Sequence, residues 1–278
     1  MSNKVWFITG ASKGLGLALV RQLLVRGYAV AATSRSLGDL TKAVGKGTDM
    51  FLPLAVDLEN ENSVKNALAE TVKYFGRVDV VVNNAGYGQV GALEELSDAE
   101  ARGNFDINVF GLLHVIRHAM PYLREQKSGH ILNISSIGGI TGNFPGWGVY
   151  CATKFAVEGL SESLAAEVKR FGVNVTVVEP GYFRTEFLTA GSMGLPQNEL
   201  AVYEDVRASQ ALHSQQVNHN QPGDPEKAAA AMIDITGETN PPLHLVLGED
   251  AYALAHAKID ALEAELELWK AVTMSTNL

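Results

Sequence analysis

Short apolar runs alternate with helical patterns along most of the chain. The apolar runs predict strands at 4–9, 28–33, 51–56, 78–82, 130–135, 173–178 and 243–247. Apolar residues at helical spacing predict helices near 14–26, 61–75, 97–126, 149–171, 225–236 and 251–271. Runs such as Val80-Val81-Val82 are apolar at every position, as a parallel strand buried on both faces requires. The alternation predicts an α/β fold with a doubly wound sheet of about seven parallel strands.

The region 186–224 breaks this rhythm. Its glycines and prolines, among them Gly191, Pro196 and Gly223, surround a short helical pattern at 199–213. Such an insertion is either a surface excursion or a lid over a substrate site. No other composition break resembles a linker, so residues 1–278 are expected to form one domain, with 186–224 as its lid.

Composition narrows the functional class. The 278 residues are 46% hydrophobic and carry a net charge of −9, without a basic patch, which argues against nonspecific nucleic-acid binding. The single cysteine, Cys151, cannot form an internal disulfide and fits a reducing, cytoplasmic location. No apolar run is long enough for a membrane span, and a strand begins too early for a signal peptide.

The first predicted strand leads into a glycine-rich turn, Gly10-Ala11-Ser12-Lys13-Gly14-Leu15-Gly16, and then into a helix. Strand, glycine turn and helix are the context that a dinucleotide pyrophosphate needs, because glycines admit its close approach and the helix N-terminus attracts its charge. The alternative, a tight turn that binds nothing, explains the flanking strand and helix less well. This element makes the predicted fold Rossmann-type.

Tyr150 and Lys154 stand four residues apart in a predicted helix, so their side chains share one face. A phenol normally keeps its proton until about pH 10. The nearby ammonium is expected to lower the pKa of Tyr150, which then exchanges a proton with an alcohol or carbonyl oxygen. Hydride transfer would require a nicotinamide cofactor. By itself the spacing also fits an aromatic ring packed under a lysine stem; the dinucleotide turn favours the catalytic interpretation.

Several motifs occur in one order: Thr9-Gly10 with Gly14 and Gly16, Asn83-Asn84-Ala85-Gly86, Ser136, Tyr150 with Lys154, and Pro180-Gly181. Together they resemble the short-chain dehydrogenase/reductase family, in its compact single-domain branch, over about residues 4–185. The resemblance implies an oxidoreductase that interconverts a carbonyl and an alcohol with a nicotinamide cofactor.

The resemblance also implies residue roles. The catalytic set would be Asn108, Ser136, Tyr150 and Lys154. Ser136 would hydrogen-bond the substrate oxygen, with Ser135 as its rival, and Asn108 would order Lys154 through a water unless it is a buried structural residue. The cofactor would be bound by Gly10, Ser12, Lys13, Gly14, Leu15, Gly16, Arg35, Asp57, Leu58, Asn84, Ala85, Gly86, Tyr150, Lys154, Pro180, Gly181, Phe183 and Thr185. Within this set, Asp57 would bond the adenine, while Pro180, Gly181 and Thr185 would meet the nicotinamide amide.

The end of the second predicted strand indicates which cofactor is used. Sites that prefer NAD place an acid there to bond the ribose 2′-hydroxyl. Here the segment 31–36 has no acid before Asp39, and it carries Arg35. A guanidinium suits a 2′-phosphate, and Lys13 could join it. We therefore predict NADP(H), against the alternative that both cations are ordinary surface charges.

The residues expected to border the substrate are mainly apolar: Tyr87, Val90, Phe144, Trp147, Tyr182, Phe187, Leu188 and Met193. Arg184 is the one cation nearby and is expected to face solvent. The set favours a small hydrophobic ketone, aldehyde or secondary alcohol as substrate. The stretch 144–147 is similar to steroid- and retinol-type members of the family.

The remaining candidate residues give weaker indications of function. His114 and His118 share a helix face without a third ligand at metal spacing, so no metal site is predicted. Cys151 is expected to be a packed small residue. Leu262, Leu266 and Trp269 on the last predicted helix are expected to be core or interface residues.

Two expectations concern assembly and function class. The resemblance implies a homodimer or homotetramer through the helices near 97–126 and 149–171. The rival to an enzyme is a non-catalytic NADP(H)-binding protein that senses redox state; the presence of both Tyr150 and Lys154 disfavours it.

Overall fold

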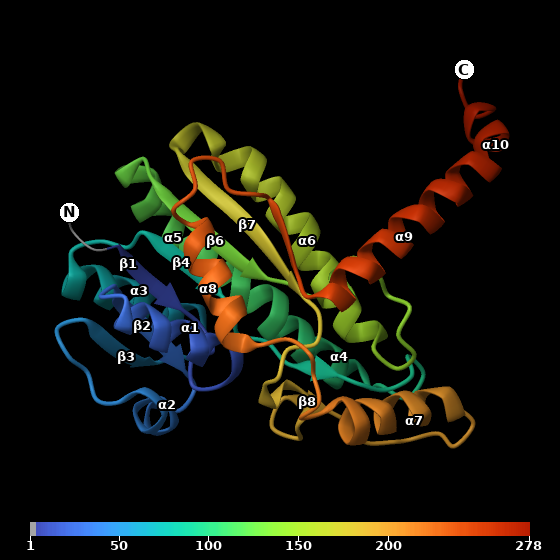
Figure 1. Ribbon diagram of the computed structural model, residues 1–278, viewed down its shortest axis with the longest axis horizontal. Coiled ribbons are helices and arrows are strands. Elements are labelled where there is room, and N and C mark those ends of the chain that lie inside the picture. The colour runs from blue at the N-terminus through green and yellow to red at the C-terminus, as the bar shows by residue number, and fades with distance from the viewer. Residues whose placement is uncertain (1–3) are drawn as a thin grey trace.

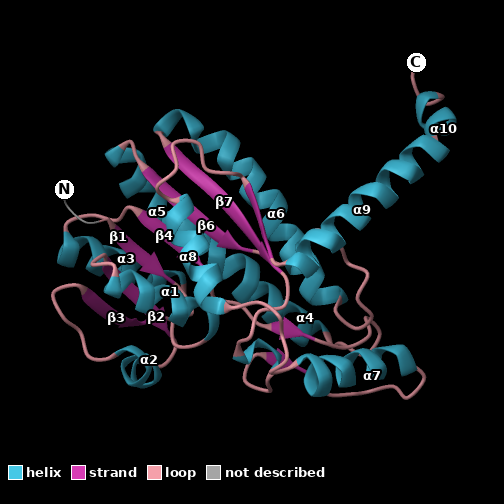
Figure 2. Ribbon diagram, in the orientation of Figure 1, coloured by secondary structure: helices cyan, strands magenta, loops and turns pink. Residues whose placement is uncertain are grey.

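The computed structural model describes residues 4–278. Its centre is a seven-stranded sheet in the order β3-β2-β1-β4-β6-β7-β9, with every neighbouring pair parallel (Figures 1 and 2). The strands are β1 (Val5–Ile8), β2 (Ala29–Ser34), β3 (Phe51–Ala55), β4 (Val80–Asn83), β6 (Gly129–Ile134), β7 (Val173–Pro180) and β9 (His244–Leu247). All seven predicted strands are present, and the predicted Rossmann-type fold class is confirmed.

Both faces of the sheet are buried, which explains the continuous apolar runs. Along β1, Phe7 faces one hydrophobic cluster while Trp6 and Ile8 face another. In β4, Val81 likewise faces the cluster of Phe7, and Val80 faces the cluster of Trp6 and Ile8. Side chains on successive strand residues point to opposite faces, so a strand covered on both sides must be apolar throughout.

Helices cover each face. On one face lie α1 (Gly14–Val25) and α8 (Pro225–Ile235). The other face is covered by α3 (Glu61–Phe75), α5 (Leu112–Gln126) and α6 (Gly148–Val168). One helix that the apolar pattern did not predict, α2 (Leu37–Val44), begins after Ser36, whose side chain accepts a hydrogen bond from the Asp39 backbone.

The helix predicted at 97–126 is divided into three parts. After α4 (Asp98–Phe105), residues 106–111 form a π-helical segment before α5 continues. Ser97 caps α4 through a capping box with Glu100. The π-helical segment contains Asn108, and such local widenings of a helix are frequent at functional sites.

The region 186–224 follows the carboxyl end of β7. A 3₁₀ turn (Glu186–Leu188) precedes β8 (Met193–Gly194), which pairs with β5 (Gly88–Gln89). Then α7 (Glu204–Ala211) runs into a π-helical segment at 212–217. The helix predicted at 199–213 is therefore present but displaced toward the C-terminus, and the two short strands were not predicted.

The last helices, α9 (Glu249–Leu268) and α10 (Lys270–Met274), extend away from the body of the protein (Figure 1). Only the start of α9 is buried, at Ala251 and Ala255. Leu262, Leu266 and Trp269 are 47%, 58% and 59% exposed, so the expectation that they belong to the core is wrong. No helix within residues 4–278 is both long enough and apolar enough to cross a membrane.

Candidate active site

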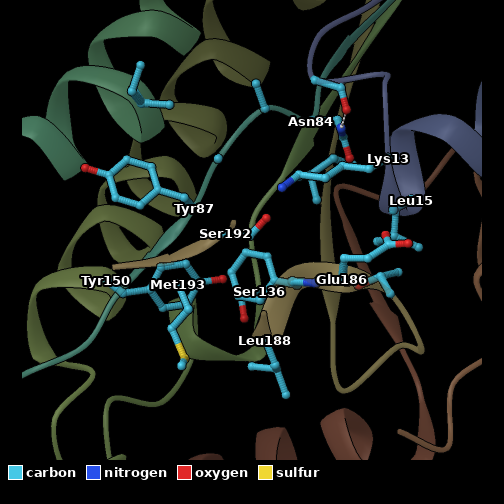
Figure 3. Close-up of a pocket in the computed structure, with 18 of the residues that line it drawn as sticks. Lys13, Leu15, Asn84, Tyr87, Ser136, Tyr150, Glu186, Leu188, Ser192 and Met193 are labelled. Carbon is cyan, nitrogen blue, oxygen red and sulfur yellow. Dashed lines mark hydrogen bonds between the residues drawn. The ribbon is translucent and has the colours of Figure 1, made fainter. Parts of the chain in front are cut away.

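A cavity of about 1130 Å³ opens at the carboxyl ends of the parallel strands. It is lined by the glycine turn after β1, by the ends of β2, β4, β6 and β7, by α6 and by the region 186–224 (Figure 3). Ligands of open α/β sheets bind at this edge, where the strand order reverses between β1 and β4. Most of the predicted site residues line it; Gly16, Asp57 and Asn108 do not.

The glycine turn is packed too tightly for side chains. Gly10 has a φ of +65°, and a Cβ there would lie 2.7 Å from the Ala85 Cα. A Cβ on Gly16 would lie 2.5 Å from the Asn84 Nδ2, which donates to the carbonyls of Thr9 and Gly10. Gly16 thus serves close packing beneath the turn, while Gly10 and Asn84 reach the cavity and form a backbone cradle that fits a pyrophosphate.

Two cations border the nucleotide end of the cavity, in different states. Arg35 is exposed and has no hydrogen-bond or ion-pair partner among residues 4–278. Lys13 instead donates to the Gly191 carbonyl at 2.9 Å, which connects the glycine turn to the region 186–224. Two carboxylates line the same end: Asp39, which the sequence places after the strand end without assigning it a role, and Glu59, which sequence reasoning missed.

Asp57, predicted to bond the adenine, lies in a turn outside the lining. Its Oδ1 accepts from the Glu59 backbone at 3.0 Å, and its own N–H donates to the Ser63 hydroxyl at 3.1 Å. The neighbouring Leu58 is the residue that borders the cavity. In this arrangement the Asp57 carboxylate shapes the entry into α3.

Tyr150 and Lys154 share one face of α6, as predicted, and both are buried in the cavity wall. The Lys154 Nζ donates to the Ile134 carbonyl at 2.8 Å and lies 5.7 Å from the Tyr150 ring centroid. Ser136 faces the same cavity beside the Tyr150 phenol (Figure 3). Its rival Ser135 is directed toward α6, where its hydroxyl donates to the Lys154 carbonyl at 3.4 Å.

Burial dominates the ionisation of this pair. Desolvation raises the pKa of Tyr150 well above 10, and the Ser136 hydroxyl only partly opposes this shift. Desolvation also lowers the pKa of Lys154 to about 8. The expectation that Lys154 lowers the pKa of Tyr150 is therefore wrong: the net shift of this pKa is upward, and desolvation is its largest cause. The phenol keeps its proton at neutral pH and is suited to donate it.

The Asn108 side chain uses its hydrogen-bonding groups within the protein. Its Nδ2 donates to the Tyr87 carbonyl and to the Thr153 Oγ1, both at 3.0 Å. Its Oδ1 accepts from the Tyr87 N–H at 3.0 Å. The Thr153 hydroxyl in turn donates to the Tyr150 carbonyl at 2.7 Å. Asn108 thus connects the segment after β4 to the turn of α6 that carries Tyr150.

An apolar wall surrounds the phenol. Trp147 and Phe187 place their ring centroids 5.6 Å and 5.7 Å from that of Tyr150. Val90 lies fully buried behind the wall. Tyr87 borders the cavity, but its hydroxyl is directed toward Gly103 on α4 (Figure 3). The lining residues of the predicted apolar set are Tyr87, Phe144, Trp147, Tyr182, Phe187, Leu188 and Met193.

Sequence reasoning missed a polar pair in this wall, Tyr182 and His213. The Tyr182 hydroxyl lies 2.8 Å from the His213 Nε2, and the His213 Nδ1 lies 2.7 Å from the Ser209 carbonyl. A carbonyl only accepts, so Nδ1 carries the hydrogen and Nε2 accepts from the phenol. Burial lowers the pKa of His213 and keeps the ring neutral. No periodic pattern indicates His213, because it lies in the irregular region 186–224.

The remaining sequence candidates have structural partners. His114 Nδ1 lies 2.8 Å from the Leu58 carbonyl, and His118 Nε2 lies 3.0 Å from the Glu61 carboxylate. Cys151 is buried against the cavity, where desolvation raises the pKa of its thiol to about 11. Arg184 is exposed and donates to the Gln221 carbonyl.

Comparison with known proteins identifies the family. The family model for short chain dehydrogenase matches residues 4–193. The oxidoreductase BOA17 of Botryotinia fuckeliana is 37% identical over 99% of both chains. The 3-ketodihydrosphingosine reductase of Bacteroides thetaiotaomicron is 36% identical over 89% of both chains. The chain belongs to the short-chain dehydrogenase family and is an oxidoreductase of that type.

Solved structures agree with this assignment. A short-chain dehydrogenase from Streptomyces avermitilis has a TM-score of 0.90 and 39% identity, with 99% of this chain and all of that chain covered. A 3-ketoacyl-(acyl-carrier-protein) reductase from Brucella melitensis complexed with NADH covers 88% of this chain and 96% of its own, at TM-score 0.73 and 25% identity. ElxO, with NADP bound, covers 90% and 99% at TM-score 0.74 and 25% identity. Structural neighbours thus bind both types of nicotinamide nucleotide.

Proposed function

We propose that the protein is an NADP(H)-dependent oxidoreductase that interconverts a carbonyl and an alcohol on a small hydrophobic substrate. One observation carries this proposal: the buried phenol of Tyr150 faces the cavity beside Ser136 and Lys154, and the glycine cradle lines the same cavity. The cradle admits a pyrophosphate because Gly10 and Gly14 adopt positive φ angles and present backbone instead of side chains.

The cavity residues have separate roles in the proposed reaction. A bound nicotinamide would supply or accept the hydride at the substrate carbon. Ser136 holds the substrate oxygen by a hydrogen bond. In reduction, Tyr150 Oη donates its proton to that oxygen as charge develops; in oxidation it removes the proton again. The Lys154 ammonium favours the phenolate that forms and is available to a ribose hydroxyl.

Cofactor preference rests on Arg35. It stands at the cavity rim with its guanidinium unpaired, where the end of β2 offers no carboxylate. A 2′-phosphate provides a bidentate partner for it. Asp39 and Glu59 border the same end, so the preference for NADP(H) depends on Arg35 outweighing two acids.

The substrate is inferred from the wall around Tyr150. Trp147, Phe187, Leu188 and Met193 offer apolar contact, and the cation in this wall, Lys154, already donates to the Ile134 carbonyl. A hydrophobic ketone, aldehyde or secondary alcohol fits this surface. The similarity to a reductase named for 3-ketodihydrosphingosine supports a lipid-like substrate.

The region 186–224 is proposed as the lid of one domain that spans residues 1–278. It supplies much of the apolar wall, and the bond from Lys13 to the Gly191 carbonyl holds it against the glycine turn. A nucleotide phosphate that attracted Lys13 would compete for this bond. Cofactor binding and lid position are therefore coupled through one side chain.

A homo-oligomer is proposed from exposed apolar side chains on the π-helical segment at 106–111, on α6 and in the loop before α4. Phe110 and Phe155 are 48% and 44% exposed, and Leu93 is 73% exposed. Burial of such side chains in an isologous interface favours association. Light scattering at micromolar concentration tests it, and a monomeric mass would contradict it.

Substrate oxidation and reduction provide the direct test of function. Purified protein would be mixed with NADPH and a panel of aromatic, steroid-like, retinoid and long-chain ketones and aldehydes, with absorbance of the reduced cofactor as the readout. We expect turnover of at least one apolar carbonyl and none of small carboxylated ketones. Tight NADPH binding without turnover of any carbonyl or alcohol would instead favour a redox-sensing protein.

A further inference from the structure

Three titratable side chains form a cluster behind the cavity wall that the proposed reaction does not use. They are Glu158 on α6, Glu179 on β7 and His244 on β9, and their ligand-type atoms all lie within 4.8 Å of one another. Glu179 is fully buried and Glu158 is 8% exposed, whereas the His244 side chain is 45% exposed. The cluster therefore reaches from the interior, behind α6, to solvent.

The two carboxyl groups are poorly partnered. Neither Glu158 oxygen accepts a hydrogen bond, and neither does the Oε2 of Glu179. The other Glu179 oxygen lies 2.7 Å from the His244 Nδ1. No lysine or arginine within residues 4–278 forms an ion pair with either acid. Desolvation, together with the neighbouring charge of Glu179, raises the pKa of Glu158 above its usual range.

Glu158 is also placed to act on Lys154. The two residues are one helical turn apart on the same face of α6, and both are buried. The Ser135 hydroxyl donates to the Lys154 carbonyl. A Cβ on Gly139 would lie 2.5 Å from that hydroxyl and 2.7 Å from the Glu158 Oε1, so the Ser135 hydroxyl and the Glu158 carboxyl both lie against Gly139.

Lys154 needs such a counter-charge. Its ammonium is buried and donates to a neutral group, the Ile134 carbonyl. Desolvation lowers the pKa of Lys154, and the charge of Glu158 acts in the opposite direction. A buried ammonium without a nearby anion would lose its proton closer to neutral pH.

We propose that Glu158 is a positioning residue for the reaction: its carboxylate, buried one turn behind Lys154, keeps the lysine ammonium charged, and Glu179 and His244 set how much charge Glu158 carries. This inference rests on the proposed function for its catalytic meaning. The electrostatic link itself, between Glu158 and Lys154, is a property of the folded chain.

Other charged groups on α6 lie near the cluster. Lys154 precedes Glu158 by one helical turn, and the Glu162 Oε1 lies 3.7 Å from the His244 Nε2. Because Glu162 is one of the charges around His244, it is not a neutral control. Glu167, exposed near the end of the same helix, is the matched control.

The test is a pH titration of the lysine side chains by NMR, in protein labelled with ¹³C at the lysine ε-carbon. The Lys154 signal is assigned by its loss in Lys154→Met. In Glu158→Gln we expect Lys154 to titrate roughly one pH unit lower than in the wild type. In Glu167→Gln it should titrate as in the wild type, because that exposed carboxylate lies several helical turns from Lys154. Equal titration of Lys154 in the wild type and Glu158→Gln would overturn the inference.

A second measurement covers the case in which Glu158→Gln does not fold. In the wild type the Lys154 signal should show a minor inflection at a pH below that of its own titration, as Glu158 ionises. In Glu179→Gln this inflection should move to lower pH, because the variant lacks a negative charge beside Glu158. A Lys154 signal without this inflection would count against the link. These readouts need no substrate, so they stand or fail independently of turnover.

Turnover then connects the link to the reaction. If the proposed function is right, the alkaline limb of the kcat profile should move to lower pH in Glu158→Gln and stay in place in Glu167→Gln. A purely structural role would lower kcat evenly across the pH range. If Lys154 titrates at a lower pH in Glu158→Gln but the protein turns over no substrate, the electrostatic link stands and the proposed enzymatic function is refuted.

Discussion

The Lys154 ammonium lies 5.7 Å from the centre of the Tyr150 ring, yet its hydrogen bond goes to the Ile134 carbonyl and not to the phenol. The lysine is thus fixed by the end of β6 and not by the phenol. Since burial favours the protonated phenol, the proposed reaction would draw a proton from Tyr150 only as negative charge appears on a nearby substrate oxygen.

The first prediction tests that arrangement with Tyr150→Phe. The change keeps the ring contacts with Trp147 and Phe187 and removes one hydroxyl. Loss of a general acid should lower kcat by roughly 10²- to 10⁴-fold. NADPH affinity, measured by fluorescence, should be nearly unchanged because the glycine cradle is untouched. Lys154→Ala should weaken both turnover and cofactor binding; native turnover in Tyr150→Phe would end the catalytic assignment.

The second prediction concerns cofactor preference. Arg35→Asp removes the unpaired guanidinium at the cavity rim and places a carboxylate where a ribose hydroxyl could bind. The ratio of kcat/KM for NADPH to that for NADH should fall by roughly tenfold or more, since each lost charge-assisted bond to phosphate is worth about 1.5–3 kcal/mol. Lys42→Asp, on exposed α2, is the control of equal charge change and should leave the ratio unchanged. Equal use of both cofactors by the native protein would sink the idea.

The third prediction compares two glycines. At Gly10 a Cβ would meet the Ala85 backbone at 2.7 Å with φ at +65°, so Gly10→Ala should lower the free energy of unfolding by roughly 2–4 kcal/mol and weaken NADPH binding. At Gly159, within α6, nothing lies within 4 Å of a Cβ, so Gly159→Ala should stabilise by about 0.5–1 kcal/mol. Urea unfolding measures both. An unchanged Gly10→Ala protein would show that the cradle tolerates a side chain.

The sheet was predictable because burial on both faces leaves its mark in consecutive residues, as at Val80–Val82. The glycine turn and the Tyr150–Lys154 spacing were readable for the same reason: each is local. The two-residue strands β5 and β8 carry too few positions for any period. The π-helical segment at Asn108 looks like ordinary helix in sequence.

The parts of the site that could not be predicted depend on contacts between distant segments. His213 meets Tyr182 across 31 residues, and Glu179 meets His244 across 65. The raised pKa of Tyr150 follows from how fully the wall covers it, which no local pattern encodes. Lys13 was predicted to meet a phosphate, whereas in the structure it donates to Gly191.

The fourth prediction concerns the Tyr182–His213 pair. Tyr182→Phe or His213→Phe alone leaves one polar atom buried without its partner, so each should lower the free energy of unfolding by roughly 1–3 kcal/mol. Both changes together remove donor and acceptor at once and should cost less than the sum of the two. A double-mutant cycle by urea unfolding should give a coupling of roughly 0.5–3 kcal/mol. Strict additivity would mean that the bond does not hold the region 186–224 in place.

The last prediction concerns acid stability and His130 on β6. This imidazole is 4% exposed, and its Nε2 lies 2.9 Å from the Thr176 Oγ1. Desolvation, with a smaller contribution from the Lys4 charge, lowers the pKa of His130 to about 4.

Between pH 4 and the unfolded pKa of about 6.5 the unfolded chain binds a proton there that the folded chain does not. The stability contributed by neutral His130 is therefore complete above about pH 6.5. It is lost as the pH falls toward 4, by up to about 3 kcal/mol.

His130→Gln, which cannot take up the proton, should flatten the fall in urea stability over this range. His219→Gln, at an exposed position, is the control and should keep the wild-type slope. An equally steep fall in His130→Gln would assign the acid sensitivity to other groups.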